Sequence, residues 1–321
     1  MSSDLGLHGI VPALATPLRP DGTLDERGCR RLIEHVLAGG VHGVLVLGST
    51  GEMAALDHPV RRRLLEVTAE ALSSRVPLLV GVAEMTLTTA LHEIHAAAAA
   101  GAQAALVVPP YYSPIDQPTV LAFYRELATS SPLPILIYNI PGFTKVVVSP
   151  EVVSQLAEEG VVAGIKDSSR DFEYIEQVLD MTGDRPGFVT FTGSDTMLLG
   201  SLAMGATGAI TLSANVAPDW GVRLYDLVRA GRWEDAREQQ RRILRLVIAL
   251  RTGVFPTGIK AALALVGICG DTPAWPATPL GEPERVRLRV ALQGLGLLPE
   301  AGEVTQGARA KAGEAPVLLK S

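Results

Sequence analysis

Lys166 has the setting in this sequence that most suggests chemistry. It lies in the segment VAGIKDSS, residues 162–169, directly after small and apolar residues. Burying an ammonium group is costly, so a lysine in an apolar strand either pairs with an acid or is present as the free amine. A free amine can add to a carbonyl and form an imine. A salt bridge to Asp167 is the structural alternative, although neighbouring residues of a strand point to opposite faces.

A second candidate site is the segment GSTGE, residues 48–52. The hydroxyls of Ser49 and Thr50, together with the turn amides, could hold a carboxylate without a formal positive charge. An ordinary turn between a strand and a helix is the alternative. The segment lacks the Gly-Lys-Ser/Thr ending of a P-loop. Taken alone, Tyr138 is typical of a core ring and the segment PPYYSP of a packing loop.

Several other functional classes are disfavoured. His92 and His95 are spaced as on one helix face, but no third metal ligand accompanies them. The sequence has no Gly-x-Ser-x-Gly elbow and no dinucleotide fingerprint after its first apolar run. A net charge of −6 argues against nucleic acid as a partner. With neither a signal-like N-terminus nor a run of about 18 apolar residues, we expect a cytoplasmic protein without a membrane partner.

The elements that would position these residues repeat one pattern. Short apolar runs end in Gly, Ser, Thr, Asn or Pro and alternate with amphipathic stretches, as expected for parallel strands buried on both faces. Asp57 with Pro59, and Ser149 with Pro150, are predicted helix starts. The pattern predicts a (β/α)8 barrel, with a doubly wound open sheet as the alternative. The eight predicted strands lie in residues 9–16, 43–50, 77–84, 104–112, 134–141, 162–169, 189–195 and 208–216.

The pattern changes after about residue 230. Three helical stretches follow, in residues 232–251, 256–270 and 283–298, and the last residues are rich in Gly, Ala and charge without periodicity. We therefore predict a catalytic barrel over residues 1–230, a helical extension over 231–300 and an unstructured tail over 301–321. Because active sites of such barrels lie at the C-terminal ends of the strands, the candidate residues should meet at one end.

Six motifs at successive strand ends carry a family resemblance. In chain order they are GSTGE, PPYY, YNIP, GIKDSS, TGSD and GAITLSANV. Each is weak alone, but the ordered set resembles the dihydrodipicolinate synthase / N-acetylneuraminate lyase family of class I aldolases. The resemblance runs from about His8 to about Leu298. It implies a lyase or aldolase that acts on pyruvate-type 2-oxo acids through a Schiff base and needs no metal or organic cofactor.

The resemblance also implies roles for single residues. Lys166 matches the Schiff-base lysine, and Tyr138 matches the tyrosine that moves protons at the reacting bonds. Ser49 and Thr50 match the pair that binds the pyruvate carboxylate, with serine where the synthases usually have threonine. Tyr112 matches a tyrosine that reaches into a neighbouring subunit's site, so we expect a homotetramer, a dimer of dimers. Two further matches line the pocket through backbone atoms: Gly193 and Ile210.

Three departures bear on the second substrate. Phe143 stands where dihydrodipicolinate synthases carry an arginine for a substrate carboxylate, and Thr196 follows Asp195 where sialic acid lyases tend to have a second acid. Ser168, within KDSS, and the segment RWEDA are closer to 4-hydroxy-2-oxoglutarate and 2-keto-3-deoxy sugar acid aldolases or dehydratases. That activity is our prediction. The alternatives are dihydrodipicolinate synthase, another chemistry of the family, and a non-catalytic metabolite-binding relative. The intact set of Lys166, Tyr138 and Ser49 argues against the last of these.

Overall fold

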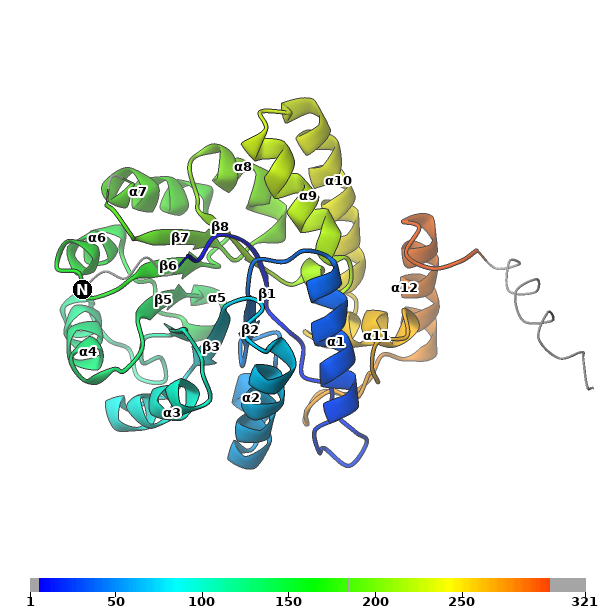
Figure 1. Ribbon diagram of the computed structural model, residues 1–321, viewed down its shortest axis with the longest axis horizontal. Helices are drawn as coiled ribbons and strands as arrows, with labels where there is room; N and C mark the ends of the chain where they lie inside the picture. Colours follow the sequence, from blue (N-terminus) through cyan, green and yellow to red (C-terminus); the bar gives the residue numbers. More distant parts are fainter. Residues whose placement is uncertain (1–5, 184, 301–321) are drawn as a thin grey trace, which may run out of the picture.

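A barrel of eight parallel strands forms the centre of the protein (Figure 1). The computed structural model describes residues 6–183 and 185–300. Neighbouring strands pair in the order β1-β8-β7-β6-β5-β4-β3-β2. Each of the eight predicted runs contains one strand, which confirms the predicted pattern. The strands are β1 (Gly9–Pro12), β2 (Val44–Val46), β3 (Leu78–Val82), β4 (Ala104–Val107), β5 (Ile135–Asn139), β6 (Gly164–Asp167), β7 (Val189–Thr192) and β8 (Gly208–Thr211).

The sheet closes between β1 and β2, its two ends. Ala13 and Leu45 form an isolated parallel bridge there, and the Leu14 amide donates to the Leu45 carbonyl at 2.9 Å. Beyond the C-terminal end of β1, Asn215 joins the segment after β8 to the segment after β1. Its side chain accepts from the Ala15 amide and donates to the Ala13 carbonyl. The fold is therefore a closed (β/α)8 barrel and not an open doubly wound sheet.

Helices surround the barrel, and one of the two predicted helix starts is a capping residue. Ser149 caps α6, and its hydroxyl accepts from the Val152 amide. Asp57 occupies the corresponding position of α2, but its side chain makes no capping hydrogen bond. The helices that follow the strands are α1 (Glu26–Ala38), α2 (His58–Leu72), α3 (Leu87–Ala99), α4 (Gln117–Ser130), α6 (Pro150–Glu158), α7 (Phe172–Thr182), α8 (Leu198–Ala203) and α9 (Pro218–Arg229), and a short α5 (Pro141–Thr144) lies directly after β5.

Alternation along the strands divides the apolar residues into two cores. One fills the barrel and includes Leu106, Tyr138 and Phe191, and the other lies between the strands and the helices and includes Ile137 and Ile165. Because successive strand residues face opposite sides, Tyr138 points into the barrel while Ile137 points toward the helices. The same alternation decides which polar residues can reach the barrel interior.

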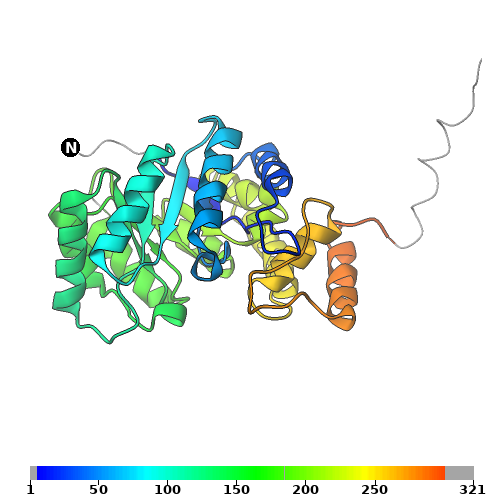
Figure 2. The ribbon, with the colours of Figure 1, turned by 90° about the horizontal axis from the view of Figure 1, so that it is seen from below.

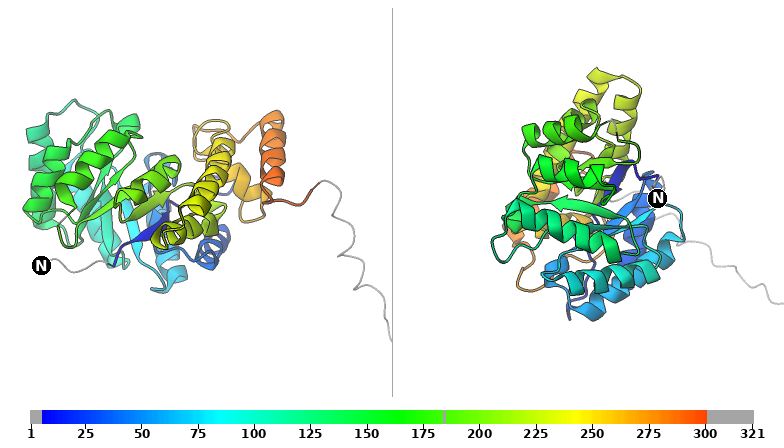
Figure 3. Two further views of the ribbon diagram at one scale, coloured as in Figure 1. Left: turned by 90° about the horizontal axis from the view of Figure 1, so that it is seen from above. Right: turned by 90° about the vertical axis from the view of Figure 1, so that its left-hand side faces the viewer.

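Three helices follow the barrel, as predicted. They are α10 (Trp233–Leu250), α11 (Thr257–Leu265) and α12 (Glu282–Gly294). Figures 2 and 3 show α11 and α12 at the side of the barrel away from α4 and α6. The division at residue 230 stays a prediction, and the predicted tail over 301–321 lies outside the described residues. Within the described ranges, no helix is long and apolar enough to cross a membrane.

Candidate active site

Lys166, Tyr138 and Ser49 form a chain of polar groups inside the barrel. Tyr138 on β5 and Lys166 on β6 are register partners. Nζ of Lys166 lies 3.2 Å from the Tyr138 hydroxyl and 4.3 Å from the centre of its ring. The Tyr138 hydroxyl lies 3.2 Å from Oγ of Ser49. The phenol can therefore exchange a proton with the amine on one side and with the serine hydroxyl on the other.

The salt bridge between Lys166 and Asp167 is not formed. Asp167 points to the opposite side of β6, where its carboxylate accepts from Nδ2 of Asn139 at 2.7 Å and from the amide and hydroxyl of Ser169. Burial raises the pKa of the Asp167 carboxyl, although these hydrogen bonds oppose the rise. The alternation of strand residues thus leaves the Lys166 amine without an acidic partner among the described residues.

Eight of the nine residues predicted for the site line one cavity of about 390 Å³ at the C-terminal ends of the strands. The exception is Tyr112, whose side chain is 89% exposed and does not line the cavity of its own chain. Its predicted place in a neighbouring subunit's site stays a prediction. The eight that share the cavity are Lys166, Tyr138, Ser49, Thr50, Phe143, Ser168, Gly193 and Ile210.

The GSTGE turn presents amides and hydroxyls to the cavity. The amides of Gly51 and Glu52 close the turn by donating to the carbonyls of Gly48 and Ser49. The amides of Ser49 and Thr50 have no acceptor within residues 6–183 and 185–300. Free amides beside two hydroxyls form a concave group of donors, which suits a carboxylate.

Gly193 is a glycine because the lysine passes close to it. A Cβ built on Gly193 would lie 2.9 Å from Cε of Lys166 and would overlap Oγ of Ser168. The space that this side chain would need is the space that the Lys166 stem occupies. This position therefore limits the space for the side chains of Lys166 and Ser168, as well as lining the cavity.

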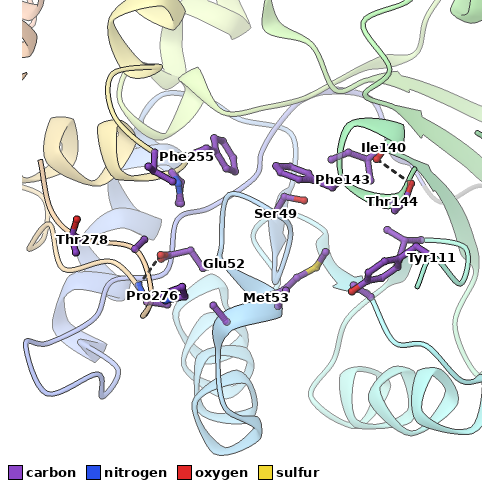
Figure 4. Close-up of a pocket in the computed structure, with 18 residues that line it drawn as sticks. Ser49, Glu52, Met53, Tyr111, Ile140, Phe143, Thr144, Phe255, Pro276 and Thr278 are labelled. Atoms are coloured by element: carbon purple, nitrogen blue, oxygen red, sulfur yellow. Dashed lines mark hydrogen bonds between the residues drawn. The ribbon is translucent and has the colours of Figure 1, made fainter. Parts of the chain in front are cut away.

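Phe143 lies between the cavity and an adjoining apolar pocket of about 530 Å³. Its ring centre is 6.0 Å from that of Phe255. Figure 4 shows the two rings side by side, with Ser49 close to Phe143. This wall of the site is thus aromatic at the position where the resemblance predicts an arginine in dihydrodipicolinate synthases.

Sequence reasoning missed the residues that follow α10. Arg251, Thr252, Gly253 and Phe255 line the cavity together with the predicted residues, and Arg170, after β6, lies on the same cavity. The strand-end rule could not select the segment after α10, because it belongs to none of the eight strands. The one sequence signal available there was Arg251, a cation at the end of the predicted amphipathic helix over residues 232–251.

A second buried lysine, Lys260 on α11, serves a different purpose. It forms an ion pair with Glu52, the last residue of GSTGE, and donates to the Thr272 carbonyl at 2.7 Å. Glu52 also accepts from the Ala274 amide at 2.7 Å, a contact drawn in Figure 4. Burial lowers the pKa of Lys260, although Glu52 opposes this. The pair holds the GSTGE turn against the C-terminal helices.

Asp195 also has a structural role, because backbone amides occupy its carboxylate. It is 3% exposed, and its carboxylate accepts from the Leu212 and Ser213 amides. It therefore ties the end of β7 to the segment after β8 and does not line the cavity. The described residues also contain no group of three or more His, Cys, Asp and Glu side chains that could hold a metal ion.

Comparison with known proteins identifies the family. The model of the dihydrodipicolinate synthetase family matches residues 6–295 of the chain. The chain belongs to this family. Its members include a 4-hydroxy-tetrahydrodipicolinate synthase of Methanopyrus kandleri, which is 35% identical over 298 residues that cover 92% of this chain and 99% of the relative. The protein is accordingly an enzyme of the carbon–carbon lyase type.

Two solved structures of the dihydrodipicolinate synthetase family are close to this one. YagE of Escherichia coli K12, solved with pyruvate, is 30% identical, has a TM-score of 0.87, and matches 91% of this chain and 99% of its own. A dihydrodipicolinate synthase variant described as monomeric is 31% identical, has a TM-score of 0.88, and matches 92% of this chain and 99% of its own. Both support the barrel and its C-terminal helices as the family fold.

Proposed function

We propose that the protein is a Schiff-base-forming lyase of pyruvate-type 2-oxo acids. The observation that carries the proposal is the buried chain from Lys166 through Tyr138 to Ser49 at the floor of one cavity. The binding of pyruvate by YagE, a relative with the same fold, supports pyruvate as the common part of the substrate.

The proposed chemistry begins with the attack of the Lys166 amine on the C2 carbonyl of the 2-oxo acid. The carbinolamine loses water to give an imine, and Tyr138 carries the protons between nitrogen and oxygen. The hydroxyls and free amides of Ser49 and Thr50 hold the C1 carboxylate. When the C3–C4 bond breaks, the protonated imine accepts the electron pair and the C4 hydroxyl gives its proton to the deprotonated Tyr138 oxygen, which releases an aldehyde and leaves an enamine. Protonation and hydrolysis then release pyruvate and regenerate the lysine.

For the second substrate we propose cleavage, condensation or dehydration of a 4-hydroxy-2-oxo acid or a 2-keto-3-deoxy sugar acid. Phe143, which is 58% exposed and paired with Phe255, supports this choice, because it cannot provide the bidentate clamp expected of an arginine. A screen of 2-oxo acids for release of pyruvate or of a dehydrated 2-oxo product tests the proposal. Failure of every 4-hydroxy-2-oxo acid and 3-deoxy sugar acid to react would contradict it.

A second candidate function is 4-hydroxy-tetrahydrodipicolinate synthase, and the names of the relatives favour it. An assay of pyruvate with aspartate semialdehyde, coupled to dihydrodipicolinate reductase, separates the two candidates. Our main proposal predicts weak condensation by the natural protein, with pyruvate still forming its imine. Turnover at a biosynthetic rate would instead establish the synthase. Phe143→Arg then tests whether the missing clamp limits the reaction, since such a contact contributes roughly 10- to 100-fold to kcat/KM.

We also propose that the enzyme is a homotetramer in which Tyr112 serves a neighbouring site. Its 89% exposure leaves the ring free to reach another chain. Light scattering should give a mass near that of a tetramer, or at least a dimer, and Tyr112→Ala should lower kcat. Because one relative is described as a monomeric variant, the measurement could give either a monomer or an oligomer. A fully active monomer of this protein would contradict the proposal.

A further inference from the structure

Two arginines from distant parts of the chain line the cavity that holds Lys166. Arg170 follows β6, and Arg251 follows the last residue of α10. Both side chains are exposed to solvent while lining the cavity. Neither forms an ion pair with any residue in the described ranges, whereas surface arginines such as Arg125 do. Two like charges therefore line one cavity without an ion-pair partner in the described ranges.

The two charges are close enough to affect each other. Burial lowers the pKa of Arg251, the charge of Arg170 lowers it further, and Asp195 opposes both effects. Asp195 does not neutralise the pair, because its carboxylate accepts from the Leu212 and Ser213 amides and lies beyond ion-pair distance. Placing two unpaired guanidinium groups together is unfavourable until an anion lies between them.

The backbone at Arg170 is also unusual. Its φ is +64°, in the left-handed region that residues other than glycine and asparagine rarely adopt. The Ser169 hydroxyl, which donates to Asp167, accepts from the Asp171 amide and so holds this turn. Such conformations persist where the surrounding structure enforces them, often at binding sites. The turn places Arg170 among the residues that line the cavity.

The other walls leave few choices for what these arginines bind. The Ser49–Thr50 turn suits the C1 carboxylate, and the wall of Phe143 and Phe255 is apolar. Lys145, another cation near the site, donates to the Gly142 carbonyl at 2.8 Å and does not line the cavity. Arg170 and Arg251 are therefore the cationic side chains in this cavity that a second anionic group of the substrate could contact.

We propose that Arg170 and Arg251 together bind an anionic group, a carboxylate or a phosphate, at the end of the substrate away from the imine carbon. This rests on the proposed function, because it assumes that a 2-oxo acid is held on Lys166. It narrows the substrate class to 2-oxo acids that carry a second anion at the distal end, or to anionic aldehydes in the reverse direction, and away from 2-keto-3-deoxy sugar acids whose distal end is uncharged. Guanidinium groups bind either oxyanion through paired hydrogen bonds.

Imine trapping with matched 2-oxo acids tests the pair without knowledge of the natural acceptor. The probes are pyruvate, 2-oxoglutarate and 2-oxopentanoate, which has a methyl group where 2-oxoglutarate has its distal carboxylate. The measured quantity is the concentration of each acid that gives half-maximal borohydride trapping on Lys166. The variants are Arg251→Gln and Arg170→Asn, because asparagine tolerates a positive φ. Arg245→Gln, an exposed arginine on α10 outside the cavity, is the matched control.

The natural protein should trap 2-oxoglutarate at a lower concentration than 2-oxopentanoate. Each site variant should raise the half-maximal concentration for 2-oxoglutarate by about 10-fold and leave those for pyruvate and 2-oxopentanoate nearly unchanged. Arg245→Gln should change none of them. The phosphonate analogue of 2-oxoglutarate distinguishes the two anions, because tighter trapping of it would assign the pair to a phosphate.

Equal trapping of 2-oxoglutarate and 2-oxopentanoate by the natural protein would overturn the assignment of the arginine pair. So would a site variant that weakens all three acids alike, because that result would indicate a general disturbance of the cavity. Absence of any pyruvate adduct on Lys166 in the natural protein would contradict the proposed function itself. The two failures are therefore distinguishable.

Discussion

Tyr138 and Lys166 are register partners on adjacent parallel strands, and the Tyr138 hydroxyl lies 3.2 Å from Nζ of the lysine. The strand pairing thus sets the distance between the amine and the group that would move its protons. The same hydroxyl meets Oγ of Ser49 at 3.2 Å. A side chain placed between these two groups can act as a general acid and base.

Tyr138→Phe removes that bridge while keeping the ring. We expect kcat to fall by about 100- to 10,000-fold, because proton transfer at the carbinolamine and at the breaking bond would lose its carrier. Steady-state kinetics and the rate of borohydride trapping measure the effect. Tyr225→Phe, in the ring cluster with His8 and His42 at the opposite end of the barrel, is the control. A Tyr138→Phe enzyme within tenfold of the natural rate would contradict the assigned role.

Gly193→Ala should misplace the lysine. The added methyl group would overlap Oγ of Ser168 and lie 2.9 Å from Cε of Lys166, so both side chains must shift to make room. A displacement of about 1 Å at a reacting group lowers kcat/KM by about 100-fold. Gly142→Ala is the matched control, since Gly142 lines the same cavity and a Cβ there meets nothing within 4 Å. Equal activity of the two variants would show that Gly193 does not aim the lysine.

The Glu52–Lys260 pair should matter for stability. The two side chains are 5% and 1% exposed, so Lys260→Met leaves a buried carboxylate without its partner. Loss of one partner of such a pair costs about 3–5 kcal/mol in the free energy of unfolding. Guanidinium titration measures it, and adding Glu52→Gln should recover part of the loss while keeping an acceptor for the Ala274 amide. A loss below about 1 kcal/mol would show that the pair does not anchor the turn.

His42 should make stability depend on pH. Burial lowers its pKa below the ordinary value of 6.5, and the nearby His8 lowers it further. The Ile10 amide donates to Nδ1 of His42 at 3.1 Å, a contact that needs the unprotonated nitrogen. As pH falls below about 6.5, the unfolded chain therefore takes up the proton first, and the folded protein loses stability down to the lowered pKa.

The test for His42 compares urea midpoints at about pH 8 and about pH 5 with those of His42→Asn, whose side-chain oxygen can accept from the Ile10 amide but does not titrate. Between about pH 8 and about pH 5, the urea midpoint of the natural protein should fall by more than the midpoint of the variant. Parallel losses in the two proteins would place the acid sensitivity at other groups.

The barrel was predictable from the sequence because its strands are buried on both faces. Apolar runs such as residues 134–141 and 162–169 mark such strands without homologues. The alternation of strand residues also indicated that Lys166 and Asp167 point to opposite faces of their strand, as the structure shows. The position of active sites at strand ends selected six residues that do share a cavity, and the family resemblance added Phe143 and Ile210. The six are Ser49, Thr50, Tyr138, Lys166, Ser168 and Gly193.

The remaining features depend on packing between distant segments. Arg251 and Phe255 reach the cavity only because α10 packs beside the barrel, and no local pattern encodes that arrangement. Asp195 ends a predicted strand and so belonged to the candidate end of the barrel, but two backbone amides from the segment after β8 occupy its carboxylate. Asp57 lies at the start of α2 without capping it, because a capping residue type does not ensure the rotamer that capping requires.

Borohydride trapping with pyruvate tests the central claim most directly. We predict one reduced pyruvate adduct per chain, mapped by mass spectrometry to the peptide that contains Lys166, and none in Lys166→Ala, which should keep its fold and lose activity. Lys145 and Lys260 serve as internal controls. The Lys145 amine donates a hydrogen bond to the Gly142 carbonyl, and Lys260 forms an ion pair with Glu52. An adduct on either of these lysines, or no adduct in the natural protein, would contradict the account.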